Sequence, residues 1–217
     1  MKIYVIRHGE TQQNVDGVIQ GQLDSELLPA GVEMARAVGV ELARRNVHFD
    51  AVFTSPLSRA KSTALAVLSG MGDKSTPVIE DQRIAECCMG SAEGKHFREG
   101  ECEIDVSVIK LFWEDPFAFP GFEGGELALD VIARTQEFLF ELAAQKDRYE
   151  TVLVSTHGFA LRGMLNCVYE NKQDYWHGHV PYNCSVSIVE SSDEGNLRLA
   201  ADDVIFYDES MLADYFS

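Results

Sequence analysis

The sequence predicts an α/β fold of three layers, in which helices cover both faces of a mostly parallel central sheet. Two observations predict it. Short apolar runs bounded by polar or turn residues are typical of buried strands, and longer helix-like stretches alternate with them. The expected strands span residues 3–6, 51–53, 77–79 and 151–154, and the expected helices span residues 30–45, 57–68 and 127–145.

Two segments depart from this alternation. Residues 184–189 and 197–205 are strand-like and are separated by a polar stretch, which predicts a terminal antiparallel hairpin. Residues 95–123 are irregular and rich in Gly, Pro and Phe, so we expect a small cap-like insertion over the active-site edge of the sheet. A chain of 217 residues that is 46% hydrophobic can bury one full core. We therefore expect residues 1–217 to form a single domain.

Composition excludes several classes of protein. The chain has 18 Lys and Arg residues against 35 Asp and Glu residues, a formal net charge of −17, which repels nucleic acids and anionic membranes. The five cysteines are odd in number and lack a C-x-x-C pair, which favours reduced thiols over disulfides or a zinc knuckle. Neither a signal peptide nor a long uncharged apolar run is recognisable. We expect a cytoplasmic protein without nucleic-acid or membrane partners.

Polar side chains follow each of the four expected parallel strands. They are Arg7 and His8 after the first strand, Arg59 after the second, Arg83 and Glu86 after the third, and His157 after the fourth. Ligands of open α/β sheets gather at these carboxyl ends. Arginine forks suit phosphate oxygens, and a neutral histidine can attack phosphorus. A carboxylic acid can protonate the leaving oxygen and then activate water. The residues therefore predict phosphoryl transfer.

The order of motifs along the chain resembles the histidine phosphatase superfamily, in its cofactor-dependent phosphoglycerate mutase-like branch. A lone Arg-His-Gly is a weak signal, whereas an ordered series is specific. The matching segments are residues 6–11 with Asn14, Gln20-Gly21, residues 54–60, Glu86 with Gly90, Glu93 and Gly94, Gly124-Gly125-Glu126, and residues 154–158.

This resemblance implies roles for individual residues. His8 would become the phosphohistidine, Glu86 would be the proton donor to the leaving group, and His157 would be a further catalytic group. The implied phosphate pocket consists of Arg7, Asn14, Arg59 and His157, and the implied substrate-binding residues are Gln20, Gly21 and Gly158. The glycine at 21 would allow close backbone approach to the substrate. Neither a metal nor a cofactor is implied, and His177-Gly178-His179 is interpreted as ordinary loop sequence.

Three functions are weighed. The first is hydrolysis of a small phosphomonoester. The alternative is a cofactor-dependent phosphoglycerate mutase, which needs extra cations, yet acidic residues outnumber basic ones between 95 and 123. Compared with mutases, Phe159 stands where they carry Asn and Met89 where they carry Tyr. The second alternative is a weakly active regulatory protein, against which the complete catalytic set argues.

The insertion and the assembly leave further questions open. Aromatic residues of the insertion are expected to fill a cap, and some of them to line a leaving-group pocket beside His96 or Arg98. A homodimer is one option for the assembly. The physiological substrate and the pathway are not identified by the sequence.

Overall fold

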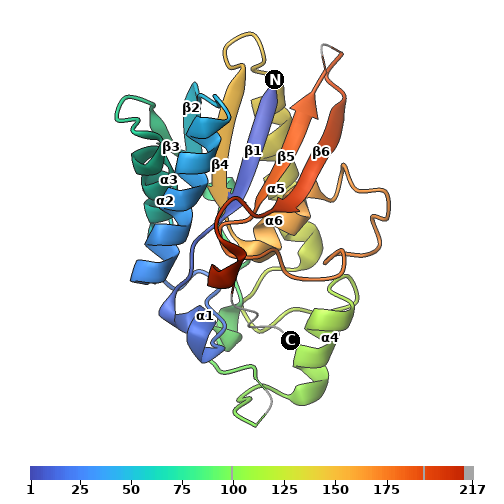
Figure 1. Cartoon of the computed structure of the whole chain (residues 1–217). Helices are drawn as coiled ribbons and strands as arrows, with labels where there is room; N and C mark the ends of the chain where they lie inside the picture. Colours follow the sequence, from blue (N-terminus) through green and yellow to red (C-terminus); the bar gives the residue numbers. More distant parts are fainter. Residues whose placement is uncertain (99, 193, 213–217) are drawn as a thin grey trace.

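The computed structural model describes residues 1–98, 100–192 and 194–212, which are built around a six-stranded sheet (Figure 1). The strand order is β3-β2-β4-β1-β5-β6. Four neighbouring strands are parallel: β3 (Val78–Glu80), β2 (Ala51–Thr54), β4 (Thr151–Thr156) and β1 (Lys2–Arg7). The last two, β5 (Val186–Ser191) and β6 (Leu197–Val204), form an antiparallel hairpin, of which β5 pairs with β1. The predicted fold class, including the terminal hairpin, is confirmed.

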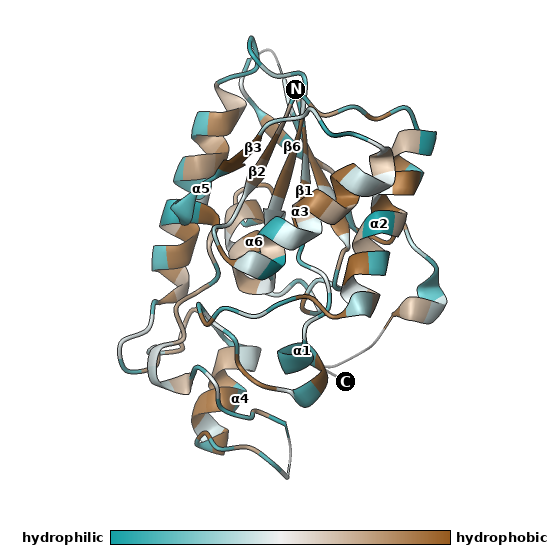
Figure 2. Ribbon diagram, turned by 90° about the vertical axis from the view of Figure 1, so that its left-hand side faces the viewer, coloured by the Kyte–Doolittle hydropathy of each residue, from teal (hydrophilic) through white to brown (hydrophobic). Residues whose placement is uncertain are grey.

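Helices cover both faces of the sheet. Figure 2 shows the apolar strands between α5 (Ala128–Ala143) on one side and α2 (Pro29–Arg44) on the other. Helix α3 (Ser58–Met71) packs beside α2, and α6 (Gly158–Leu165) packs beside α5. These pairs form the two outer layers of the fold.

The first strand explains why the buried runs are continuously apolar. Its side chains alternate between the two faces, as in any strand. Ile3 and Val5 belong to the core beneath α5 and α6, whereas Tyr4 and Ile6 belong to the core beneath α2 and α3. Because both faces are covered, each position must be apolar.

The packing of α2 against α3 depends on two glycines. A Cβ added at Gly39 would lie 2.0 Å from the carbonyl oxygen of Val67, and one added at Gly70 would lie 2.1 Å from that of Arg36. A side chain at either position would separate the helices. The glycines therefore set how closely this layer packs.

Three helices were not expected from the sequence. They are α1 (Gln12–Asp16), α4 (Val106–Glu114) within the 95–123 segment, and α6. The strand expected from residue 184 starts at Val186, because the backbone of Cys184 is left-handed (φ 58°) and interrupts the extended conformation.

The carboxyl ends of the parallel strands point toward α1 and α4 (Figure 1). Aromatic side chains of the 95–123 segment pack in a third core cluster with Phe159 and Trp176. This cluster attaches the segment to the edge of the sheet where the candidate residues lie. Among the described residues, no helix combines the length and apolarity needed to cross a membrane.

Candidate active site

The two candidate histidines leave adjacent parallel strands. Arg7 and Thr156 are paired at the ends of β1 and β4, so His8 and His157 follow from neighbouring positions. Their ring centroids are 5.2 Å apart and both side chains are buried. The convergence inferred from the sequence is therefore present for this pair.

His8 is held as one particular neutral tautomer. Its Nδ1 lies 2.7 Å from the carbonyl oxygen of Gly9, which can only accept, so Nδ1 donates and Nε2 keeps its lone pair. Burial, and then the charges of Arg59 and Arg7, hold the pKa of His8 well below its usual range. The ring is therefore neutral at pH 7. An uncharged nitrogen with a fixed lone pair is what a nucleophilic histidine requires.

Arg59 connects three parts of the site. It lies in the first turn of α3, and its Nη1 and Nη2 donate to the carbonyl oxygens of Leu23 (2.8 Å) and Gly21 (2.6 Å). Its Nε donates to Nδ1 of His157 (3.2 Å). Burial lowers the pKa of Arg59 to about 10, which leaves it charged at pH 7. This charge fixes the Gln20 loop beside the histidines.

His157 is bonded through both ring nitrogens. Because Nδ1 accepts from Arg59, the proton of the neutral ring is on Nε2, which donates to Oγ of Ser55 (2.8 Å). Burial and the charge of Arg59 keep the pKa of His157 well below its usual range. The side chain is fully buried and is not among those lining the cavity described below. In this structure His157 therefore lies outside the cavity lining and helps to position Arg59 through their hydrogen bond.

Glu86 is held at the start of α6. Its Oε1 accepts from the backbone N–H groups of Cys87 and Ala160 (both 2.9 Å), and its Oε2 accepts from that of Phe159 (3.2 Å). These three N–H groups hold the carboxyl group beside the N-terminus of α6. Among the described residues, backbone N–H groups therefore orient this side chain.

Arg7 and Asn14 complete the polar part. Arg7 is buried and donates through Nη1 to the carbonyl oxygen of Pro181, and burial lowers its pKa to about 10. The Oδ1 of Asn14 accepts from the backbone N–H (3.1 Å) and the hydroxyl (3.0 Å) of Thr11 at the cap of α1. Because its oxygen is occupied, Asn14 offers its NH₂ group to a ligand.

One cavity joins these residues. Its polar lining consists of Arg7, His8, Gln13, Asn14, Gln20, Gly21, Arg59, Glu86 and Gly158. Its apolar lining consists of Val18, Ile19, Met89, Phe97, Phe112, Trp113, Phe159, Trp176 and Val180. Every site residue expected from the sequence, except His157, therefore faces a single space of about 620 Å³, part of which is open to solvent.

Comparison with protein families agrees with this geometry. The model described as histidine phosphatase superfamily, branch 1, matches residues 3–203. The chain belongs to this superfamily. Membership confirms the family and the enzyme class expected from the sequence, that of a histidine phosphatase.

The relatives of this histidine phosphatase include both hydrolases and mutases. The chain is 31% identical to a broad-specificity phosphatase of Saccharomyces cerevisiae, in an alignment that covers 88% of this chain and 79% of the relative. It is 30% identical to a 2,3-bisphosphoglycerate-dependent phosphoglycerate mutase of Methylobacterium, covering 75% of this chain and 78% of the relative. The solved structure of YhfR from Bacillus stearothermophilus has a TM-score of 0.81 at 31% identity, covering 93% of this chain and 96% of that one.

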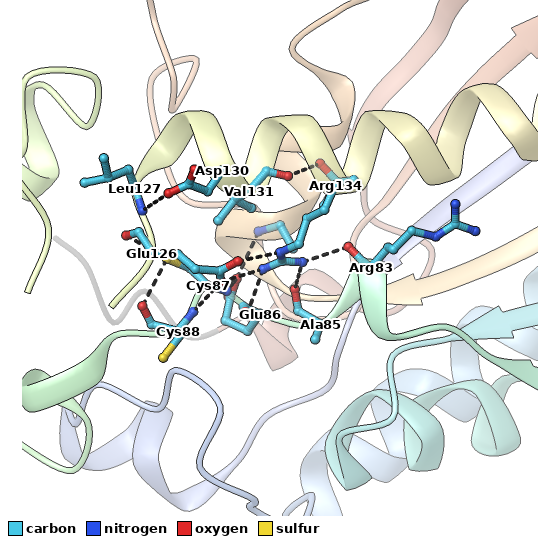
Figure 3. A network of polar contacts seen from close by, with 12 residues as sticks. Arg83, Ala85, Glu86, Cys87, Cys88, Glu126, Leu127, Asp130, Val131 and Arg134 are labelled. Atoms are coloured by element: carbon cyan, nitrogen blue, oxygen red, sulfur yellow. Dashed lines mark hydrogen bonds and ion pairs between the residues drawn. The ribbon is translucent and has the colours of Figure 1, made fainter. Parts of the chain in front are cut away.

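In this histidine phosphatase, a network that was not foreseen from the sequence positions the Glu86 segment (Figure 3). Arg134 of α5 donates through Nη1 to the carbonyl oxygens of Arg83 and Ala85 (both 2.7 Å), and through Nη2 to that of Glu86 (3.1 Å). The same guanidinium forms a two-point ion pair with Glu126, at 2.8 and 2.9 Å. Oε2 of Glu126 accepts from the N–H of Cys88 (2.8 Å). These contacts hold residues 83–88 against α5.

Two other supporting residues were also missed. Asn183 is buried and donates through Nδ2 to the carbonyl oxygen of His8 (2.9 Å). Ser55 belongs to the 54–60 motif, and its hydroxyl is the partner of His157. Neither follows a periodic pattern, so position in the motif was the only available signal for Ser55 and no signal pointed to Asn183.

The fold requires a glycine at position 21, in addition to the close substrate approach expected from the sequence. Gly21 is left-handed (φ 51°), and a Cβ there would lie 2.2 Å from Oε1 of Glu93. That oxygen accepts from the backbone N–H groups of Gln22 (2.9 Å) and Met89 (3.0 Å). Glu93 thus ties the loop to the segment after Glu86.

The remaining candidates lie outside the cavity lining. His96 and Arg98 bond to backbone carbonyl oxygens around α1, of Asp16 and of Asn14 and Val15 respectively. His177 stacks on Tyr169, with ring centroids 3.6 Å apart. Within the described ranges, no group of three or more His, Cys, Asp or Glu side chains could hold a metal ion.

Proposed function

We propose that this histidine phosphatase hydrolyses a small phosphomonoester through a phosphohistidine on His8. Nε2 of His8 attacks phosphorus, the bond between phosphorus and the alcohol oxygen breaks, and protonated Glu86 gives its proton to that oxygen. Water then attacks the phosphohistidine and Glu86 takes a proton from it. The bond between phosphorus and Nε2 of His8 breaks with its electron pair returning to Nε2, and inorganic phosphate leaves. Arg7, Asn14 and Arg59 neutralise the phosphoryl oxygens in both steps.

The observation that carries this proposal is the orientation of the His8 ring. The Gly9 carbonyl fixes the proton on Nδ1, and the cavity lies against the same side chain. Two arginines whose pKa values remain near 10 flank it. A neutral nucleophile beside two cations suits attack on a phosphate dianion. In this proposal His157 positions Arg59. Direct contact of His157 with phosphate would require one of its two hydrogen bonds, to Arg59 or to Ser55, to break.

Hydrolysis is favoured over the mutase alternative by the charge of the lining. A phosphoglycerate carries a carboxylate besides its phosphate, and a mutase must retain it while the phosphoryl group is transferred. Among the described lining residues, the basic side chains are Arg7, His8 and Arg59, all used by the phosphoryl group itself. No cation is left for the carboxylate.

The deciding experiment combines trapping with product analysis. We expect acid-labile, base-stable phosphate on wild-type protein after rapid quenching with a labelled aryl phosphate, located on His8 by peptide mapping. His8→Ala should lose both the label and phosphate release, while Arg44→Ala on the exposed end of α2 serves as the control. Release that persists in His8→Ala would refute the proposal. Isomerisation of 3-phosphoglycerate with its bisphosphate primer, without release, would favour the mutase.

The same proposal covers compartment and architecture. The five cysteines are unpaired in the structure, which is compatible with a reducing cytoplasm. The surplus of acidic residues disfavours nucleic-acid partners. We treat residues 1–217 as one domain whose segment 95–123 caps the site, and a small phosphorylated metabolite as the partner.

A further inference from the structure

The cavity has an aromatic wall directly beside the proposed acid. Phe112 and Phe159 stack with ring centroids 5.5 Å apart, and Trp113 and Trp176 lie 5.4 Å apart. Phe97 contacts Trp113 at 5.6 Å. All five rings line the cavity, and the backbone N–H of Phe159 donates to Glu86. Whatever is attached to the leaving oxygen must therefore lie against aromatic surface.

The lining holds no spare charge for the leaving group. Among the described residues of the lining, the ionisable ones are Arg7, His8, Arg59 and Glu86, and each already has a part in the proposed chemistry. The neutral polar side chains are Gln13, Asn14 and Gln20, and Oε1 of Gln20 accepts from the hydroxyl of Ser25 (2.8 Å). A carboxylate on the leaving group, placed against the aromatic rings, would lose water without gaining an opposite charge.

Basic groups next to the cavity are engaged elsewhere. Arg98 donates to the carbonyl oxygens of Val15 and Asn14, and Arg134 is paired with Glu126 behind the Glu86 segment. Recruiting either one would break several hydrogen bonds. The aromatic wall, in contrast, offers stacking surface without any rearrangement.

We infer that the leaving group is an uncharged, flat and apolar alcohol, such as a phenol or an aryl-substituted alkanol, and that esters with an anionic leaving group are rejected. This inference rests on the proposed hydrolysis at His8 and adds the chemistry that selects the substrate. It separates the protein from enzymes whose substrate is an amino-acid or hydroxy-acid phosphate, because those substrates carry charges near the phosphate.

The experiment compares two esters that differ by one charge. 4-Carbamoylphenyl phosphate and 4-carboxyphenyl phosphate have similar size and the same type of leaving oxygen. We expect kcat/KM to be at least about tenfold higher for the neutral ester. Of two alkyl esters, 2-phenylethyl phosphate should likewise have a higher kcat/KM than phosphoserine. A ratio near one, or a preference for the charged ester, would overturn the inference.

Long-range repulsion by the acidic surface must be separated from selection in the cavity. The net charge of −17 disfavours every additional anionic charge, but salt screens this effect. The ratio should therefore persist between 0.15 and 0.5 M NaCl. A ratio that collapses to one at the higher salt concentration would attribute the preference to surface charge and overturn the inference.

A variant tests the wall itself. Trp113 is half-buried, and Trp113→Arg would place a cation among the rings. We expect the neutral-to-charged ratio to fall at least about tenfold, through a gain on the carboxylate ester. Phe140→Arg makes the same charge change on the exposed face of α5, where Phe140 is 51% exposed, and should leave the ratio as in wild type. An unchanged ratio in folded Trp113→Arg would overturn the assignment of this wall.

The outcomes distinguish the two proposals. His8-dependent release with no preference for neutral esters would overturn only the substrate class. Release that does not depend on His8 would overturn the proposed function and this inference together. Circular dichroism monitors folding of the Trp113 variant, and if that variant does not fold, the ratios measured with wild-type protein decide.

Discussion

Nε of Arg59 donates to Nδ1 of His157 across 3.2 Å, so the arginine and the buried ring determine each other's position. Because an arginine is always a donor, His157 must present a lone pair at Nδ1 and its proton at Nε2. The fully buried histidine therefore acts on the site through the guanidinium. Five expectations follow from this and from the other contacts of the site.

Arg59→Lys should lower kcat/KM by about 10²-fold, because an ammonium cannot bond to Gly21, Leu23 and His157 together. Inhibition by inorganic phosphate and by vanadate should weaken in parallel. Steady-state kinetics and inhibition constants measure both effects. Arg44→Lys, at the exposed end of α2, is the matched control. Unchanged inhibition by vanadate would contradict the role of Arg59 as a phosphate ligand.

Stability should fall as the pH drops below about 6.5. Burial holds the pKa values of His8 and His157 well below the usual 6.5, so the unfolded chain binds protons that the folded chain does not. The contribution of each histidine is complete above that pH and declines by about 1.4 kcal/mol per pH unit below it. Urea unfolding between pH 5.5 and 7.5 measures this slope. His8→Gln should remove about half of it, and a slope equal to that of wild type would show that His8 is not buried in the neutral form.

Glu86→Gln should slow alkyl phosphates about 10²-fold more than 4-nitrophenyl phosphate, because only the alkoxide needs a proton in order to leave. The measurement is kcat/KM on matched aryl and alkyl esters. Equal slowing on both would argue against Glu86 as the acid.

Arg134→Gln should cost about 2 kcal/mol of unfolding free energy, because three carbonyl oxygens and Glu126 lose their partner. It should also shift the aryl-to-alkyl rate ratio in the same direction as Glu86→Gln, since Arg134 positions that segment. Arg83→Gln is the control. Its ion pairs with Asp81 and Glu141 remain in contact with solvent, with the Arg83 side chain 28% exposed, so it should cost less than Arg134→Gln, about 1 kcal/mol. A stability loss without any change in the ratio would make Arg134 purely structural.

Gly21→Ala should destabilise the protein by about 2 kcal/mol and raise KM, because it adds a steric clash with Glu93 to the strain of a left-handed residue. Gly72→Ala has similar strain (φ 72°) but meets no atom within 4 Å, and should cost about 1 kcal/mol. The difference between the unfolding free energies lost by the two variants, measured by chemical unfolding, gives the cost of the clash with Glu93. Equal losses would show that Glu93 yields without consequence.

The sequence predicts those features that depend on strand ends and motif order. His8 and His157 were expected to converge because residues that follow parallel strands share one edge of a sheet, and their ring centroids are indeed 5.2 Å apart. Helix α6 was missed because every one of its side chains is buried, so it lacks the polar face that makes a helix recognisable.

The supporting contacts could not be predicted in the same way. Arg134 looks like an ordinary cation on an amphipathic helix, and only the fold places it against the carbonyl oxygens of residues 83–86. Asn183 lies in a turn, directly before the left-handed Cys184 and outside the helices and strands. Partners so distant along the chain leave no periodic trace.

Strand β1 has a consequence for the way this protein is made. It comes first in sequence among the described strands, yet both of its neighbours in the sheet, β4 and β5, begin after residue 150. Asn183 reaches the carbonyl oxygen of His8 across 175 positions. A nascent chain therefore lacks both neighbours of β1 until residues beyond 150 have emerged, so the proposed nucleophile His8 cannot reach its folded environment before that point.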